Sequence, residues 1–302
     1  MATIRAFYLL AAAGVGYACG LSIDEKRRNS FKVKAQMLRV PKFQYPERVR
    51  RLRKYGSPKR DTILQYDDFQ VSFDRRNRTP NYVVERLQYG KLKTQPSSGN
   101  FKFHADDGDE IAGMFQPKAY DYVKSGYWKG RLVAGKNHNH TPNSHKDTYK
   151  LTTVVPQVPG FAISAWADLE CYLRYLTHSY KSVYVFTGSL YLPKDEYQFK
   201  SEVIGDNHVA VPTHFYKLVI CDKHEGGVDM GCYLMENDSC MAEICEPLST
   251  FRITLEQLES IGRFKLFKDP KAHTYFGELP DIPDFRVNVQ EYMEKVGLGH
   301  VV

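Results

Sequence analysis

Three histidines lie close together, one at the end of a glycine-containing run and two just after it. Histidine is the side chain best suited to proton transfer near neutral pH. The run SGYWKGRLVAGKNH spans residues 125–138, and two further histidines follow it. His138, His140 and His145 are therefore candidates for a general base or for ligands of a transition metal. The alternative is a surface loop whose histidines make ordinary hydrogen bonds, and the residue types alone leave both open.

The six cysteines offer no comparable chemistry. None forms a CxxC pair, and Cys240 and Cys245 stand five residues apart, which is a poor spacing for a zinc site. We interpret them as buried or free thiols, with one disulfide as the alternative.

Positive charge is concentrated in one segment of the 302 residues. Residues 24–60 carry fourteen Lys and Arg against three carboxylates, a net charge of +11, and three prolines interrupt them. The whole chain carries +7 and Arg5 adds one charge, so residues 61–302 carry −5. Such an arm can bind nucleic acid or anionic lipid, whereas the acidic body weakens any nucleic-acid hypothesis.

An uncharged stretch precedes the arm. The eighteen residues 6–23 carry no charge. A helix of this length would be about 27 Å long, close to the roughly 30 Å thickness of the hydrocarbon core of a bilayer. The basic flank beyond it disfavours simple export. An uncleaved membrane anchor is the prediction, and a cleaved signal or presequence and a buried helix stay open. We expect an anchor or targeting segment at 1–23, a basic linker at 24–54 and a folded domain at 55–302.

The domain's periodicity alternates between strands and helices. Residues 69–73 and 81–87 predict a hairpin, and 182–188 a buried strand. A second strand region runs from 209 to 220 and is interrupted by Pro212. Helices are expected at 164–180, whose apolar residues repeat every three or four positions, at 254–261 behind a Thr-x-x-Gln capping box, and at 284–296. These elements predict an α+β fold, with a mainly antiparallel central sheet flanked by helices.

Taken in order, these elements resemble the DNA/RNA non-specific endonucleases with a ββα-metal site, and among them the endonuclease G group. The matching runs are RKYGSP (53–58), SFDRR (72–76), YVVERL (82–87), SGY (125–127), DT (147–148), VPQVP (155–159), AW (165–166) and, longest, VIGDNHVAVPTHF (203–215). The resemblance implies the ββα-metal endonuclease fold, a mitochondrial address and, often, a homodimer.

The motif that carries the family's chemistry is degenerate here. After Ser-Gly-Tyr the family has Asp-Arg-Gly-His, and its histidine is the general base. This chain has Trp128, Lys129, Gly130 and Arg131 at those positions. Only the glycine survives, and an arginine accepts no proton at neutral pH.

The resemblance also implies that the metal site is changed. The family's direct Mg²⁺ ligand is an asparagine in the pattern Leu-Asn-x-x-x-Trp-x-x-Leu-Glu, and its position here is Ala162, whose methyl group cannot coordinate a metal. The outer carboxylate Glu170 is retained, and a supporting asparagine is replaced by Thr153. We expect an ion pair between Arg131 and Glu170 to fill the vacated site. His138 or His140 would be the relocated base if any activity remained.

The resulting hypothesis is a catalytically inactive endonuclease G-like protein, anchored in the mitochondrial inner membrane by residues 6–23 and facing the intermembrane space. Its expected partners are a second copy or an active paralogue, an unidentified protein, and nucleic acid or anionic lipid through residues 24–60. No cofactor is expected. The alternative is a residual DNA/RNA endonuclease, a phosphodiesterase dependent on Mg²⁺ or Mn²⁺. A third class is an interaction module, whose signature is an exposed apolar patch.

Overall fold

The computed structural model describes residues 61–94, 99–163, 165–193, 202–242, 246–267, 276–281, 285 and 288–301. These residues belong to one compact unit, Arg60–Val302. All the buried hydrophobic clusters of the described residues lie inside this unit, so a fragment that begins just before it holds its own core. The predicted anchor at 6–23 and the basic arm lie outside the described residues. Within the described part of the chain, every helix is too short or too polar to cross a bilayer.

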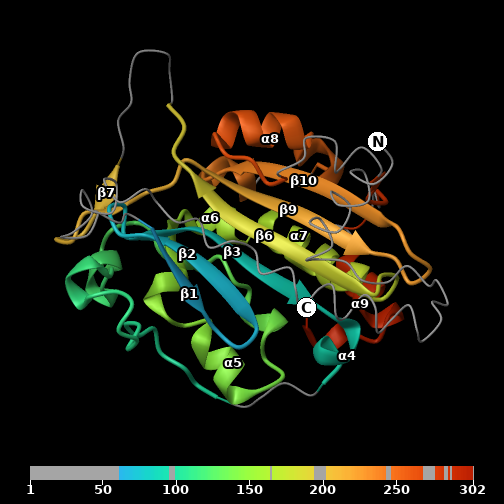
Figure 1. Cartoon of the computed structure of the whole chain (residues 1–302), viewed down its shortest axis with the longest axis horizontal. Coiled ribbons are helices and arrows are strands. Elements are labelled where there is room, and N and C mark those ends of the chain that lie inside the picture. The colour runs from blue at the N-terminus through green and yellow to red at the C-terminus, as the bar shows by residue number, and fades with distance from the viewer. Residues whose placement is uncertain are drawn as a thin grey trace, which may run out of the picture. The chain divides into compact units, whose positions relative to one another are not determined.

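The predicted hairpin opens the central sheet. It consists of β2 (Phe69–Asp74) and β3 (Thr79–Leu87), and β1 (Asp61–Gln65) pairs with its outer side. Three long strands continue the sheet: β6 (Ser182–Leu190), β9 (His214–Asp222) and β10 (Val228–Glu236). The short β11 (Arg252–Ile253) and β12 (Gly277–Glu278) both pair with β10. The order is β1-β2-β3-β6-β9-β10-β11, and only the β10–β12 pair is parallel (Figure 1), which confirms the antiparallel prediction.

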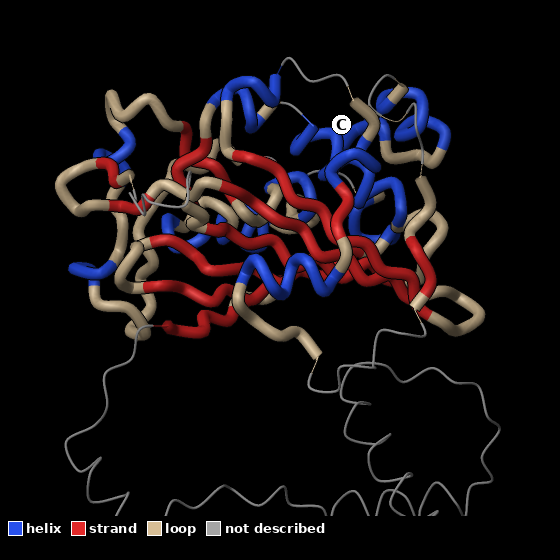
Figure 2. The backbone as a smooth tube through the Cα atoms, turned by 90° about the horizontal axis from the view of Figure 1, so that it is seen from above, coloured by secondary structure: helices blue, strands red, loops and turns tan. Residues whose placement is uncertain are grey.

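Alternate residues of β9 point to opposite sides of the sheet, and each side is covered by a helix. Phe215 and Val219 join the main core, which α7 (Ala165–Leu176) completes with Trp166 and Leu169. Tyr216 and Leu218 pack instead with α8 (Leu255–Gly262). Helices accordingly lie on both sides of the strands (Figure 2).

Two ribbons and several short helices surround the sheet. The ribbons are β4 (Trp128–Arg131) with β5 (Val154–Gln157), and β7 (Val203–Ile204) with β8 (Val209–Ala210). The remaining α-helices are α4 (Tyr89–Leu92), α5 (Pro142–Asp147), α6 (Pro159–Ala162) and α9 (Val289–Lys295). The 3-10 turns are η2 (Gly113–Phe115), η3 (Ala119–Tyr122), η4 (Gly135–Asn137), η5 (Leu151–Thr153), η6 (Ser239–Ala242), η7 (Leu248–Phe251) and η8 (Gly299–Val301).

Two boundaries differ from the prediction, and one predicted break is present. The helix expected over 164–180 ends at Leu176, where Thr177 turns back to donate to the carbonyl of Arg174. The C-terminal helix begins at Val289 rather than at residue 284. The predicted interruption at Pro212, which has no amide hydrogen for a strand ladder, separates β8 from β9, and the two strands belong to different sheets.

Candidate functional site

Arg131, which the resemblance assigns to the family's base position, is the last residue of β4 and lies opposite Val154 of β5. Its Nη1 donates to Thr148 Oγ1 at 3.4 Å, and its Cζ lies 4.6 Å from the centre of the Tyr149 ring. The guanidinium also covers Gly135, where an added Cβ would come within 2.5 Å of Nη1. The side chain is therefore held by a cation–π contact and close packing. It has no lone pair with which to activate water.

The metal-ligand position and its supporting position carry no suitable donor. Ala162 is the last residue of α6 and offers only a methyl group. Thr153 is buried, and its hydroxyl donates to the backbone carbonyls of Thr148 and Lys150 at 3.2 and 2.8 Å. Among the described residues, no group of three His, Cys, Asp or Glu side chains could hold a metal ion. With a methyl group at the expected ligand position, the residues that the resemblance assigns to this site do not fit the family's divalent cation.

The retained carboxylate Glu170 has a different partner from the one expected. Lys217 of β9 places its Nζ 3.9 Å from Glu170 Oε1, and no ion pair between Arg131 and Glu170 occurs among the described side chains. The same Nζ donates to Thr187 Oγ1 at 2.9 Å and lies 4.4 Å from the centre of the Trp166 ring. The predicted Arg131–Glu170 pair is wrong because Arg131 turns toward Tyr149, whereas Lys217 projects from the sheet toward α7.

His138 belongs to a buried polar network rather than to an accessible site. Its Nε2 lies 2.8 Å from Glu85 Oε2, which also accepts from Asn137 Nδ2 at 3.0 Å. Arg174 Nη1 donates to Asn137 Oδ1 at 3.2 Å. Burial alone raises the pKa of Glu85, but the hydrogen bond and charge of His138 and the charge of Lys217 outweigh it and hold that pKa below its ordinary value. Since His138 is 1% exposed, it cannot meet a nucleic-acid phosphate as a relocated base.

The other two histidines also have separate surroundings. His140 Nε2 lies 3.2 Å from Asp68 Oδ2. His145 packs edge-on against Phe101 and lies 5.5 Å from the Tyr149 ring. Burial lowers the pKa of both, and the charge of Arg131 lowers that of His145 further. The three histidines therefore have different partners, and His140, which is less buried than His138, is paired with Asp68.

In the rest of the motif, Lys129 and Gly130 make packing contacts and Trp128 is exposed. Lys129 Nζ lies 5.4 Å from the Tyr122 ring centre and 5.8 Å from that of Phe103. Trp128 is 51% exposed. Gly130 is pressed against Gln157, whose Cδ would lie 2.1 Å from an added Cβ. The surviving glycine is thus required by the packing of β4 on β5.

Sequence reasoning missed four residues of this region: Glu85, Lys136, Arg174 and Lys217. Lys217 had a signal, because it stands alone among apolar residues in the middle of a strand, and such a lysine must find a buried partner. Lys136 is exposed next to the network, and the charge of Arg174 adds to partial burial in lowering its pKa. No local pattern marks Glu85 or Arg174.

Comparisons with known proteins identify the family of the chain. The family model for DNA/RNA non-specific endonuclease matches residues 49–273. The chain belongs to the DNA/RNA non-specific endonuclease family. Among curated members it is 37% identical to mitochondrial endonuclease G of Homo sapiens over 212 residues, 69% of this chain and 70% of that protein. It is 32% identical to mitochondrial endonuclease G of Caenorhabditis elegans, over 75% of each chain.

A solved structure extends the match to the fold. The crystal structure of the EndoG/EndoGI complex, which concerns inhibition of EndoG, superposes with a TM-score of 0.66 at 35% identity. It covers 77% of this chain and 96% of that one. The chain is therefore an endonuclease G-like member of the family in both sequence and architecture, and the predicted resemblance is confirmed.

Proposed function

We propose that this chain is a mitochondrial endonuclease G-like protein that no longer cleaves nucleic acid and acts through binding. The observation that carries the proposal is the state of Arg131, at the position of the family's base. Its guanidinium is engaged by Thr148 and Tyr149 and can take no proton from water. General-base catalysis contributes roughly 10²–10⁴-fold to a rate, so its loss alone is severe.

Two further observations support the proposal. Ala162 supplies no ligand for a metal, and His138, the nearest alternative base in the sequence, is buried against Glu85. The general base and the metal ligand are lost at two separate positions, so a single compensating side chain would not restore the reaction. We infer no metal or cofactor for the natural protein.

The mitochondrial address is inferred from relatives that are named as mitochondrial endonucleases G. An uncleaved anchor at 6–23, facing the intermembrane space and followed by a linker at 24–54, remains our proposal for how the domain is held. The relative solved with its inhibitor EndoGI supports a protein partner for this fold. We also propose that the chain forms a homodimer or a heterodimer with an active paralogue. Binding of nucleic acid through the basic arm is a further proposal.

Cleavage of plasmid DNA and of RNA by residues 55–302, with Mg²⁺ or Mn²⁺, tests the proposal. A revertant with Trp128→Asp, Lys129→Arg, Arg131→His, Thr153→Asn and Ala162→Asn restores the family residues, and the same revertant with Glu170→Ala is its control. We expect the natural domain to be silent, the revertant to cut and the control to lose that activity. Cleavage by the natural domain that Glu170→Ala abolishes would overturn the proposal in favour of a residual endonuclease.

A further inference from the structure

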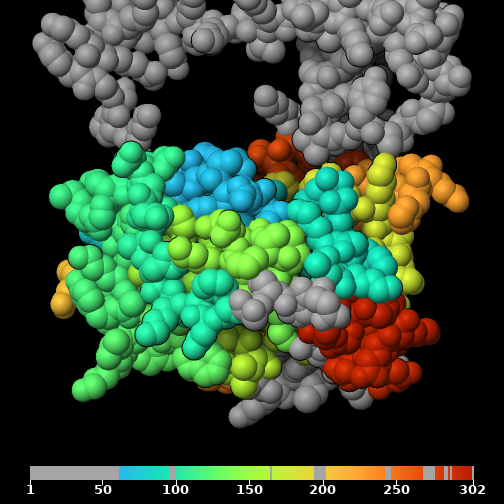
Figure 3. Space-filling model, turned by 90° about the horizontal axis from the view of Figure 1, so that it is seen from below, coloured from blue at the N-terminus to red at the C-terminus, as the bar shows by residue number. Residues whose placement is uncertain are grey.

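Two cations of the degenerate motif lie on one face of the ribbon formed by β4 and β5. Lys129 and Arg131 are two residues apart on β4, so their side chains point to the same side, about 7 Å apart at the backbone. Gly130, between them, faces Gln157 on the other side. Both cations are half-buried. The green part of the chain, to which this ribbon belongs, covers much of the face shown in Figure 3.

Each cation rests on an aromatic ring, and the two rings contact each other. Lys129 Nζ lies 5.8 Å from the centre of the Phe103 ring, and Arg131 Cζ lies 4.6 Å from that of Tyr149. The centres of these rings are 5.2 Å apart. Phe101 extends the row, with its ring centre 5.9 Å from that of Tyr149. Contacts with rings therefore hold both cations in place.

Neither cation is neutralised by the part of the chain that the structure describes. Among the ion pairs there, none involves Lys129 or Arg131. The hydrogen bond from Arg131 to Thr148 is long, at 3.4 Å, and uses only Nη1. The Lys129 ammonium and the other Arg131 nitrogens are not among the buried polar atoms that lack a partner, so they reach solvent. Their N–H donors are therefore available to a ligand.

The carboxylates of this region have other partners. Three of them lie 3.1 to 3.9 Å from Lys150 Nζ: Asp106, Asp107 and Asp147. Asp121 is 1% exposed, and its Oδ1 accepts from Asn207 at 2.9 Å. Glu202 accepts a hydrogen bond from Tyr127. Negative charge in this region is therefore gathered away from Lys129 and Arg131.

The surroundings of Arg131 are electrostatically positive. Burial is the largest cause of the lowered pKa of His145, followed by the charges of Arg131 and His138. No carboxylate of the described residues raises this pKa. The charge of Asp68, by contrast, acts to raise the pKa of His140. An anion that approaches Arg131 is therefore attracted by its surroundings.

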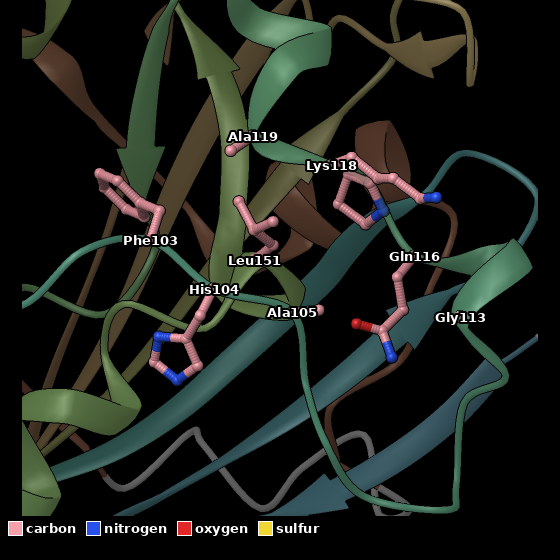
Figure 4. Close-up of a pocket in the computed structure, with 9 residues that line it drawn as sticks. Phe103, His104, Ala105, Gly113, Gln116, Lys118, Ala119 and Leu151 are labelled. Carbon is pink, nitrogen blue, oxygen red and sulfur yellow. The ribbon is translucent and has the colours of Figure 1, made fainter.

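The Phe103 ring also forms one wall of a hollow of about 300 Å³. None of the residues that line this hollow is a carboxylate, and two of them, His104 and Lys118, are basic. Figure 4 shows Phe103 on one side of the hollow and Lys118 on the other, with the Lys118 nitrogen turned outward. A phosphate that reaches Lys129 past Phe103 therefore meets no carboxylate from this wall.

We propose that Lys129 and Arg131 bind successive phosphates of a single nucleic-acid strand directly, without a metal ion. An arginine that stacks on a ring keeps the edge of its guanidinium free for a phosphate. The separation of about 7 Å along β4 suits phosphates one nucleotide apart and is too wide for the two phosphates of a diphosphate. Trp128, directly before Lys129, is 51% exposed and offers a ring on which a base stacks. This inference rests on the proposed loss of cleavage, because a strand that is bound and not cut stays on the protein.

Fluorescence anisotropy of a labelled single-stranded DNA oligonucleotide tests the proposal. The protein is residues 55–302, which lacks the basic linker 24–54, and the buffer contains EDTA. We expect binding whose logarithm falls with the logarithm of salt concentration at a slope of about −1.4, for two phosphates. Arg131→Gln and Lys129→Gln should each reduce the size of this slope by about 0.7. Trp128→Ala should weaken binding about fivefold or more. Lys295→Gln, on α9, is the matched control and should change neither quantity.

Two further measurements separate the possible failures. The same oligonucleotide is incubated with Mg²⁺ and run on a denaturing gel. Cutting there would refute the proposed function, whereas an uncut strand that does not bind would refute only this inference. NMR titration of His145 locates the ligand: a phosphate on Arg131 offsets the guanidinium charge, so the oligonucleotide should raise the pKa of His145.

Three results would overturn the proposal, provided that each variant keeps the circular dichroism and thermal midpoint of the natural fragment. The first is no binding of the uncut strand in EDTA. The second is an unchanged salt slope in both Lys129→Gln and Arg131→Gln, or binding that leaves the pKa of His145 unchanged, because the strand would then lie elsewhere. The third is equally tight binding of polyglutamate, because the site would then accept an acidic protein segment as readily as a nucleic acid.

Discussion

The side-chain nitrogen of Lys217 lies 3.9 Å from Oε1 of Glu170, joining the middle of β9 to helix α7. Lys217 is 1% exposed and Glu170 20%, so the pair sits at the boundary between core and solvent. Burial lowers the pKa of the lysine, while Glu170 and Glu85 oppose that shift. Glu170 therefore has a cationic partner within the fold.

Replacing Lys217 should be costly. In Lys217→Met the buried carboxylate Glu85 loses a nearby cation and Thr187 loses its hydrogen-bond partner, so we expect the free energy of unfolding to fall by about 3–5 kcal/mol. Urea unfolding followed by circular dichroism measures this. Lys295→Met, at an exposed lysine of α9, is the control and should change stability little. A loss below about 1 kcal/mol would show that the buried charge is not needed for stability.

Gly130 should be required by packing rather than by chemistry. An alanine Cβ would overlap Gln157, so Gly130→Ala should destabilise the domain by about 1–3 kcal/mol. Shortening the neighbour should relieve the overlap, so adding Gln157→Ala should recover part of that loss. Thermal unfolding of Gly130→Ala, of Gln157→Ala and of the double variant gives a double-mutant cycle that measures this coupling. Strictly additive effects would mean that the two side chains do not collide.

The Arg131 guanidinium should suppress protonation of His145. Burial is the larger cause of the lowered pKa of His145, and the charge of Arg131 is the next. Arg131→Gln should therefore raise the pKa of His145, whereas Arg131→Lys should leave it nearly unchanged. Titration of the imidazole Cε1 proton by NMR measures the shift. An unchanged pKa of His145 in Arg131→Gln would show that the Arg131 charge does not act on His145.

The same shift has a consequence for stability. Because the folded pKa of His145 lies below the ordinary value of 6.5, an unfolded chain takes up a proton first as the pH falls. Stability contributed by neutral His145 is thus present above pH 6.5 and is lost as the pH falls toward the folded pKa. His140 acts with the same sign. Urea midpoints at pH 7 and at about pH 5 should differ less in Arg131→Gln than in the natural domain.

The cap of α8 should contribute measurably. Thr254 Oγ1 accepts from the Gln257 amide at 3.1 Å, and Gln257 Oε1 accepts from the Thr254 amide at 2.8 Å. Thr254→Ala should lower the free energy of unfolding by about 1 kcal/mol, and Thr254→Ser should restore most of it. Equal urea midpoints for Thr254→Ala and the natural domain would show that tertiary packing alone holds this helix.

Features fixed by neighbouring residues were predictable from the sequence. The hairpin 69–73/81–87 and the Thr254 cap follow from alternation and from a four-residue pattern, and the structure contains both. The Lys217–Glu170 contact was not predictable, because it depends on β9 lying between β6 and β10. The orientation of the Arg131 side chain depends likewise on its contact with the Tyr149 ring. The burial of His138 depends on its contact with Glu85, which lies 53 residues earlier in the chain.

The positions that the resemblance assigns to a changed family motif are Trp128, Lys129, Arg131, Thr153 and Ala162, and they differ in how closely the fold holds them: Trp128 is 51% exposed, whereas Thr153 is buried. In evolutionary terms, a substitution at exposed Trp128 is screened less by folding than one at Arg131 or Thr153, which pack and hydrogen-bond inside the domain. Once selection for cleavage is relaxed, such positions can drift while every strand keeps its register. The scaffold remains available for selection on a new surface.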